Sequence, residues 1–325
     1  MILGMRNHTK KPRSRSNSNY RVRNWAAYDK ALVQRGSLTF WLSDDFAQSW
    51  QAAATHQRGA QRTYSDQAIQ LVLTLKEVFH LTNRAVEGLT RSLFTLLKLA
   101  VSVPDHSTLS RRGTDLPIQL PKQQRGPMDL VMDSTGLKVY GEGEWKVRLH
   151  GKSKRRTWRK LHLAVDPASG EIQVARLTAN SCSDDEAAVG MIAQVDQPLK
   201  RFAADGGYDK RKVYDALRAQ APAAQVLIPP RKNARIWQHG NSRAERLARD
   251  ENVRAIRRQG RTAWKQATGY HIRSLSETAM YRMKTIFGDK LSTRLLETQR
   301  TQALVRCAAL NQMTHLGMPQ SYTVG

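Results

Sequence analysis

Apolar residues recur at helical spacing through the first third of the chain, each time after a polar residue that can begin a helix. Ser65 can cap a helix over residues 66–79, and Thr82 can cap a second helix that continues to Leu97. Shorter helical patterns cover residues 25–34, 44–50 and 105–112. The pattern therefore predicts an all-α, helix-turn-helix-like region over residues 25–115.

The pattern changes after residues 116–127, a segment with three prolines that we interpret as a linker. Short apolar runs bounded by turn residues then predict strands, and longer amphipathic stretches predict helices between them. The predicted strands cover residues 130–132, 137–140, 161–165, 172–177, 201–204 and 226–228, and the predicted helices cover 184–195 and 210–220. Early strands followed by helix, strand, helix and strand are the order of a ribonuclease-H-like α/β domain. We assign residues 128–228 and 270–325 to this domain, with residues 229–269 as an insertion.

A late helix is predicted to carry four chemically active side chains on one face, those of Tyr270, Arg273, Glu277 and Lys284. At about 100° of rotation per residue, the four fall within an arc of roughly 60°. The opposite face is an apolar stripe formed by Ile272, Leu275, Ala279, Met283 and Ile286. A solvated charged face would have the same spacing, so the other acidic residues of the chain decide between the two interpretations.

Two aspartates follow apolar strand patterns and are candidates to join Glu277 in one site. Asp133 follows residues 130–132, and Asp205 follows residues 201–204. The ends of neighbouring strands and the adjacent helices of an α/β sheet line a common site. Three converging carboxylates would repel one another unless cations lay between them. Their hard oxygen ligands suit Mg²⁺ or Mn²⁺, and two such ions would support phosphoryl transfer.

The charge of the chain indicates a polyanionic partner. The 325 residues include 53 Lys and Arg against 27 Asp and Glu, a net charge of +26. Nucleic acid is the expected partner because clustered cations release counterions from phosphates. Residues 1–24 hold seven Arg and Lys and no acid, and are predicted to form a basic flexible tail.

Further basic residues are candidates for DNA contact. Arg111 and Arg112 end the polar helix over 105–112, as in a reader of the major groove. A basic segment without acids contributes Lys152, Lys154, Arg155, Arg156, Arg159 and Lys160. The insertion has eleven Lys and Arg, and its Trp237 could stack on an unpaired base or anchor the insertion to the core. Solvated loops would have similar composition, so both interpretations remain open.

The sequence also limits the classes of protein to consider. No apolar run approaches the roughly 20 residues of a membrane span, and no secretory signal is visible at the N-terminus. The two cysteines, Cys182 and Cys307, have no metal-ligand spacing. We therefore expect a cytoplasmic protein without a membrane partner.

Three segments resemble the motif regions of bacterial insertion-sequence DDE transposases. They surround Asp133 (131–136), Asp205 (204–209) and the Tyr270–Arg273–Glu277–Lys284 series, which resembles the Y-R-E-K signature of that class. Residues 24–38 and 103–112 are similar to the IS-five group. The resemblance implies that Asp133, Asp205 and Glu277 bind two Mg²⁺ or Mn²⁺ ions, and that Tyr270, Arg273 and Lys284 position DNA. It further implies a homodimer or larger assembly on double-stranded DNA, with terminal inverted repeats and target DNA as substrates. A protein of this kind is expected to associate with the bacterial nucleoid.

Three other functions are compatible with these residues. A ribonuclease-H-like nuclease or resolvase would share the carboxylates but would not join strands. A catalytically inactive DNA-binding protein, or a basic RNA-binding protein, would need only the charge. Two side chains are also ambiguous: His162 could act as a base or pack within its strand, and Asp129 could support Asp133 or cap the strand.

Overall fold

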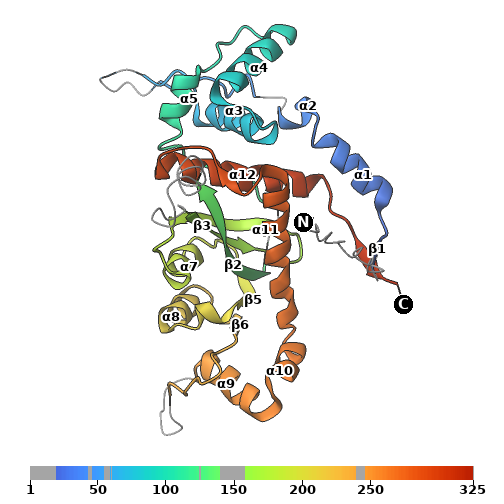
Figure 1. Cartoon of the computed structure of the whole chain (residues 1–325), viewed down its shortest axis with the longest axis vertical. Coiled ribbons are helices and arrows are strands. Elements are labelled where there is room, and N and C mark those ends of the chain that lie inside the picture. The colour runs from blue at the N-terminus through green and yellow to red at the C-terminus, as the bar shows by residue number, and fades with distance from the viewer. Residues whose placement is uncertain are drawn as a thin grey trace, which may run out of the picture.

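The computed structural model describes residues 20–42, 46–54, 59, 61–123, 126–139, 158–238 and 246–324. In Figure 1 the N-terminal helices lie at one end of an elongated molecule, a sheet forms the middle, and two helices from residues 246–267 lie at the other end. None of the helices in these residues is long and apolar enough to cross a membrane.

The N-terminal region has five helices in its described residues, and most begin where the sequence predicts. They are α1 (Trp25–Gln34), α2 (Leu38–Trp41), α3 (Asp66–Val78), α4 (Asn83–Leu96) and α5 (His106–Arg112). The side chains of Ser65, Thr82 and Asp105 accept hydrogen bonds from the first turns of α3, α4 and α5. The predicted helix over 44–50 is wrong in its described part, where residues 46–49 form a turn. There Trp50 is buried and donates a hydrogen bond from Nε1 to Ser102 O at 2.8 Å.

A mixed sheet forms the second layer, in the order β4-β3-β2-β5-β6. Its strands are β2 (Met128–Val139), β3 (Trp158–Val165), β4 (Ile172–Ala179), β5 (Leu199–Ala204) and β6 (Gln225–Leu227). The strands β2, β3 and β4 pair antiparallel, whereas β5 and β6 continue parallel to β2. The prediction of separate strands at 130–132 and 137–140 is wrong, because β2 pairs with β3 without interruption from Val131 to Lys138. Asp133 therefore lies within a strand and does not end one.

Helices cover both faces of this sheet. Alternate residues of β2 point to opposite faces. Leu130 and Met132 pack with α7 (Asp184–Ile192) and α8 (Arg211–Gln220). On the other face, Val131 and Leu137 share a core with α11 (Ser274–Phe287), α12 (Leu296–Leu316) and α3. The predicted α/β order is present, and the same buried cluster continues from the sheet into the N-terminal helices.

Helix α12 is the largest element that the sequence did not predict. It spans 21 residues, and polar side chains are buried along it together with apolar ones. Gln299, Arg306 and Asn311 are all buried and hydrogen-bonded. Because the helix is enclosed by the sheet and by α3, its polar and apolar residues do not separate into two faces, and the periodic signal is lost.

The remaining elements connect the layers. The insertion contains α9 (Ala248–Gln259) and α10 (Arg261–Ala267), and short 3₁₀ helices occupy Gly206–Tyr208 and Tyr270–Arg273. A two-residue strand, β7 (Lys290–Leu291), adds to the far end of β2, and β1 (Tyr20–Val22) pairs with β8 (Ser321–Thr323). In the segment interpreted as a linker, Leu116 is buried and Pro121 O accepts a hydrogen bond from Asn311 at 2.9 Å.

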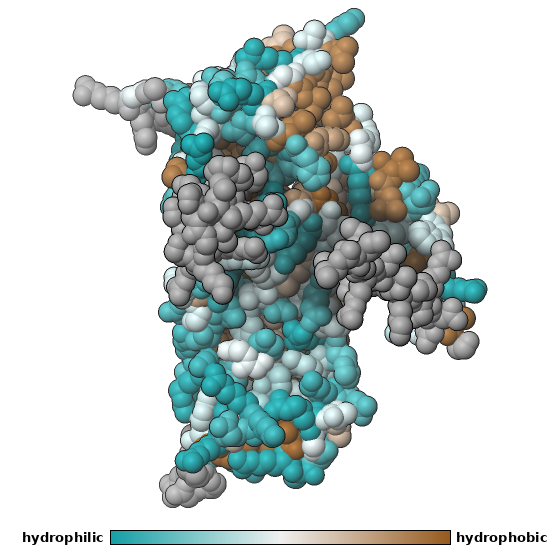
Figure 2. Space-filling view, in the orientation of Figure 1, coloured by the Kyte–Doolittle hydropathy of each residue, from teal (hydrophilic) through white to brown (hydrophobic). Residues whose placement is uncertain are grey.

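The hydropathy of the surface in Figure 2 changes from one end of the long axis to the other. Hydrophobic residues gather over the N-terminal helices, whereas the rest of this face is mostly hydrophilic. Exposed apolar side chains of the N-terminal region include Trp25, Val33, Leu96 and Leu97.

Candidate active site

Two neighbouring strands place the candidate aspartates next to each other. In the parallel pair formed by β2 and β5, Met132 lies opposite Ala204. Asp133 follows Met132 within β2, and Asp205 follows Ala204 directly after β5 ends. Adjacent strands are about 4.8 Å apart, so the backbones of Asp133 and Asp205 lie next to each other. Asp205 also caps the following 3₁₀ helix, because its Oδ1 accepts a hydrogen bond from Gly207 N at 2.8 Å.

An arginine links Glu277, the third candidate carboxylate, to Asp133. Arg273 Nη1 donates to Asp133 Oδ2 at 2.7 Å, and Nη2 of the same guanidinium pairs with Glu277 Oε1. Ser276, which is buried, donates from Oγ to Asp133 Oδ2 at 3.4 Å. One guanidinium thus joins carboxylates that are 144 positions apart in the chain, on β2 and α11.

The electrostatics of Asp133 show that the three carboxylates act on one another. Burial raises the pKa of Asp133 above its ordinary value, and the negative charges of Asp205 and Glu277 raise it further. The hydrogen bond from the Ser134 N–H and the charge of Arg273 act in the opposite direction. The charges of Asp205 and Glu277 thus reach Asp133, and Arg273 is a cation that opposes them.

The three carboxylates are ligands that suit a divalent cation, but the Arg273 guanidinium lies between Asp133 and Glu277. Carboxylate oxygens are the ligands that Mg²⁺ and Mn²⁺ prefer. Within the described residues, no three Asp, Glu, His or Cys side chains are grouped closely enough to hold one metal ion. Arg273 provides the positive charge that an ion would provide, so the carboxylates are gathered around an arginine in this conformation.

Tyr270 does not lie on the helix face that the sequence predicts it to share with Arg273, Glu277 and Lys284. It lies in the 3₁₀ helix before α11, its side chain is buried against Trp264, and its OH donates to Ala204 O at 3.2 Å. Burial raises the pKa of Tyr270 to about 12. The change of helix type at Ser274 turns this residue inward, and Tyr270 fixes the end of β5 from which Asp205 continues.

Glu277 and Lys284 remain on the outer side of α11. The side chain of Glu277 is 58% exposed, and Lys284 is partly exposed two turns further along the helix. On the inner side, Ala279 and Met283 are buried as predicted, but Leu275 is 40% exposed, so the apolar stripe starts later than expected.

A second polar cluster beside Asp133 was not predicted as a group. Asp184, at the first turn of α7, accepts from Ser134 Oγ at 3.1 Å and from Lys160 Nζ at 3.4 Å. Its charge and those of Asp133 and Asp205 all raise the pKa of Tyr208, although burial raises it most. Asp184 is therefore a fourth carboxylate near Asp133, in contact with the next residue of β2. The signal available in the sequence was the position of Asp184 at the start of the predicted helix over 184–195.

Comparisons with known proteins now identify the family. Two family models described as a transposase DDE domain match this chain, one over residues 33–142 and one over residues 124–312. The second match covers more than half of the 325 residues. The chain belongs to the DDE transposases. A cryo-EM structure of a piggyBac transposase synaptic complex with hairpin DNA is also similar, at 12% identity and a TM-score of 0.38, covering 87% of this chain and 73% of that chain.

Several residues of the transposase that the sequence predicts to contact DNA form hydrogen bonds or ion pairs within the protein itself. Arg112 pairs with Asp66, and Arg159 Nε donates to Gln299 Oε1 at 2.8 Å. Lys160 donates to Cys182 O at 3.0 Å as well as to Asp184. Arg111, by contrast, is exposed. The other members of the basic segment, Lys152, Lys154, Arg155 and Arg156, lie outside the described residues.

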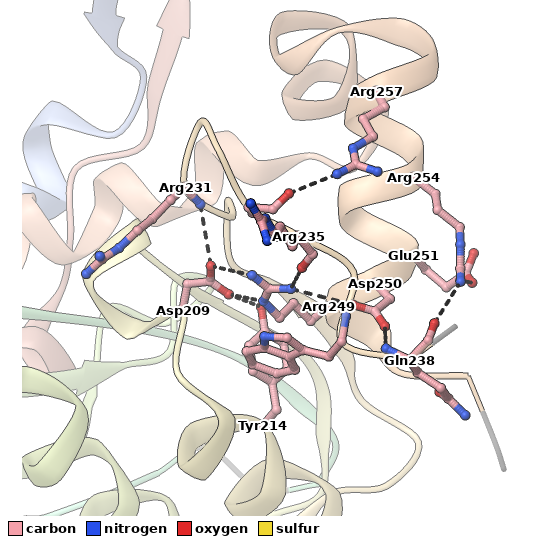
Figure 3. Close-up of polar contacts among 12 residues, drawn as sticks. Asp209, Tyr214, Arg231, Arg235, Gln238, Arg249, Asp250, Glu251, Arg254 and Arg257 are labelled. Carbon is pink, nitrogen blue, oxygen red and sulfur yellow. Dashed lines mark hydrogen bonds and ion pairs between the residues drawn. The ribbon is translucent and has the colours of Figure 1, made fainter. Parts of the chain in front are cut away.

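The insertion of the transposase is joined to the sheet through a buried ion pair, shown in Figure 3. Arg249 of α9 donates from Nε to Asp209 Oδ1 at 2.8 Å, four residues after Asp205. The guanidinium carbons of Arg249 and Arg211 lie 3.9 and 4.8 Å from the ring centroid of Trp237. Asp250 accepts a hydrogen bond from Trp237 N at 3.0 Å. An edge-to-face contact with Tyr214, at 5.6 Å between ring centroids, completes these contacts. Trp237 is thus held within the protein, which matches the anchoring role that the sequence left open for it.

His162 gives the transposase a pH-dependent stability that can be measured. Burial lowers the pKa of His162 to about 4, and the pKa is about 6.5 when the chain is unfolded. The unfolded chain therefore binds the proton more readily, so stability falls as the pH drops from 6.5 toward 4. The linkage predicts a loss of about 2 kcal/mol at pH 5. Urea unfolding of the wild type at pH 7.5 and pH 5 tests this.

The His162→Gln variant isolates this effect. Glutamine can still hydrogen-bond Thr178 Oγ1, which lies 2.9 Å from His162 Nε2, but it does not titrate. The variant should lose about 2 kcal/mol less than the wild type over the same pH change. His271→Gln, at an exposed histidine, should behave as the wild type does. Equal losses in all three proteins would contradict the assignment to His162.

Proposed function

We propose that this transposase binds the terminal inverted repeats of an insertion sequence, cleaves its ends and joins the freed 3′-hydroxyl to target DNA. The observation that carries the proposal is the gathering of Asp133 and Glu277 on Arg273, next to Asp205. Asp133 and Glu277, on separate elements, share one cation despite their mutual repulsion, and Asp205 follows the strand beside Asp133. This arrangement suits a site that binds cations.

The proposed catalytic residues are Asp133, Asp205 and Glu277, which would hold two Mg²⁺ or Mn²⁺ ions. When bound, such ions activate the attacking oxygen and stabilise the leaving oxygen of an in-line phosphoryl displacement. Arg273 would turn from the carboxylates to a DNA phosphate, for which its planar fork is suited. Lys284, about 10 Å from Glu277 along the helix, would contact a neighbouring phosphate. Tyr270 would act by holding the end of β5 in place.

The domain organisation is part of the same proposal. Residues 128–228 and 270–325 would be a ribonuclease-H-like catalytic domain, which the strand order and the mixed pairing support. Residues 25–115 would bind the transposon end in a helix-turn-helix-like manner, with Arg111 of α5 among the contacts. The Tyr270–Lys284 series would be the Y-R-E-K signature of an IS-five-like transposase, and bridging two ends would require at least a dimer on DNA.

A joining assay tests the function directly. The substrate is a duplex carrying the short inverted repeat that flanks the reading frame, supplied with Mg²⁺ and a target plasmid. We expect nicking at the repeat and a product in which the 3′ end is covalently joined to the plasmid. Nicking without joining would favour a nuclease, and binding without nicking would favour an inactive DNA-binding protein.

Replacing Arg273 with Gln should strengthen divalent-cation binding while it weakens cleavage. The variant removes the positive charge that now lies between Asp133 and Glu277, so these carboxylates keep only an added cation as counter-charge. We expect Mn²⁺ affinity, measured by electron paramagnetic resonance, to rise roughly tenfold, a small part of what one adjacent charge can contribute. Arg294→Gln, at an exposed arginine, should leave the affinity unchanged. Unchanged or weaker Mn²⁺ binding in Arg273→Gln would contradict the proposed site.

A further inference from the structure

Two arginines, Arg35 and Arg282, have no counter-charge in the described part of the chain. Arg35 ends α1, and Arg282 lies on α11 about 140° around the helix from Glu277, on the side away from the candidate active site. Neither guanidinium forms an ion pair with a described carboxylate. Buried nitrogens of both, Arg35 Nε and Nη2 and Arg282 Nη2, have no hydrogen-bond partner. Three of the seven such atoms among the described residues thus belong to these two side chains.

The two guanidinium groups are close enough to repel each other. Burial lowers the pKa of Arg282 to about 10, and the positive charge of Arg35 lowers it further, with only Tyr28 acting in the opposite direction. The partners that the pair does have are neutral. Arg282 Nη1 donates to Thr314 Oγ1 at 3.1 Å, and the Arg35 guanidinium lies over the ring of Tyr28 at 5.8 Å. Like charges with unpaired N–H groups are unfavourable when desolvated, so this cluster is incomplete.

The structure around the pair is suited to admit a ligand. Helix α1 has a single buried residue, Ala31, so it is lightly fixed to the rest of the molecule. A small displacement of α1 would open the unpaired nitrogens, which are enclosed in this conformation. The C-terminal end of α1 is held to α2 by the hydrogen bond from Trp41 Nε1 to Arg35 O at 3.0 Å, so the displacement is a movement of the helix about this end.

We propose that Arg35 and Arg282 form a binding site for a phosphate group. Two guanidinium groups on different helices need acceptor oxygens that face in different directions, and a tetrahedral phosphate presents them. A planar carboxylate instead pairs fork to fork with one arginine. The group is either a backbone phosphate of DNA or free phosphate. The first source rests on the proposed function, whereas the second does not.

Inorganic phosphate is the first probe. Thermal unfolding of the full chain is followed in phosphate and in chloride at equal ionic strength. We expect a saturable rise in melting temperature with phosphate, and about tenfold weaker or no binding in Arg35→Gln and in Arg282→Gln. Without phosphate, each variant should melt no lower than the wild type, because the repulsion is gone. Arg300→Gln, at an exposed arginine of α12, should respond as the wild type does.

Duplex DNA with single neutral methylphosphonate linkages separates the two sources. If the site holds backbone phosphate, one substituted position should weaken binding of the wild type and have no further effect on Arg282→Gln. If only inorganic phosphate responds, the site takes free phosphate. The proposal is overturned if both probes fail, if the variants melt lower without phosphate, or if an acidic peptide stabilises the wild type and phosphate does not. Failure of DNA cleavage alone would count against the proposed function and leave the phosphate result standing.

Discussion

The Asp133→Asn variant should fold as well as the wild type and cleave transposon ends about a thousandfold more slowly. Asparagine has the shape of aspartate but lacks the negative charge that would hold a divalent cation. It also removes a carboxylate whose ionised form is disfavoured by burial and by the charges of Asp205 and Glu277. The melting temperature should therefore stay level or rise while activity is lost. Cleavage rates at fixed Mg²⁺, together with thermal unfolding, measure both effects.

Asp129→Asn is the matched control for this experiment. Asp129 lies four residues earlier on the same strand, and its Oδ1 accepts a hydrogen bond from Arg201 Nε at 3.0 Å. The sequence left open whether Asp129 supports the site, and its pairing with Arg201 indicates that it holds β2 to β5. Its substitution should reduce stability slightly and leave the cleavage step intact. A similar loss of cleavage in both variants would mean that general damage to β2, and not the charge of Asp133, explains the result.

Local signals were enough to predict the elements that have one apolar face and a marked end. The helices α3 and α4 begin directly after the predicted capping residues Ser65 and Thr82, because a side-chain oxygen at that position satisfies a free backbone N–H. Strands β3 to β6 were found from short apolar runs between turn residues. The joining of two runs into β2 was missed, since the polar residues from Asp133 to Thr135 continue the strand only because β3 pairs with them.

The residues of the candidate site could be predicted from the sequence, but most of their spatial arrangement could not. Asp205 could be placed at a strand end, and Arg273 and Glu277 could be placed one turn apart on a helix. The contact of Arg273 with Asp133 depends on how α11 packs across the sheet, which no local pattern encodes. Tyr270 turned out to be buried, because the 3₁₀ turn before Ser274 changes the rotation on which the single-face prediction depended.

The Glu77→Gln variant should lose about 3–5 kcal/mol of unfolding free energy, the largest stability effect that we expect. Glu77 on α3 is buried, and its Oε2 accepts a hydrogen bond from Arg306 Nε of α12 at 2.7 Å. Burial alone would raise the pKa of Glu77, but Arg306 and Lys76 outweigh it and hold the pKa below its ordinary value. The substitution leaves both cations buried without a counter-charge. Urea denaturation at pH 7 measures the loss.

Two further variants show whether the charge pair itself is responsible. Glu297→Gln, in the exposed first turn of α12, should change the stability by no more than about 0.5 kcal/mol. Glu77→Gln combined with Arg306→Met should lose clearly less than the sum of the two single variants, because no arginine remains unpaired. Strict additivity would show that Glu77 and Arg306 act independently. Coupling would instead mean that one buried pair fixes the N-terminal helices to α12, and through it to the sheet that carries Asp133 and Asp205.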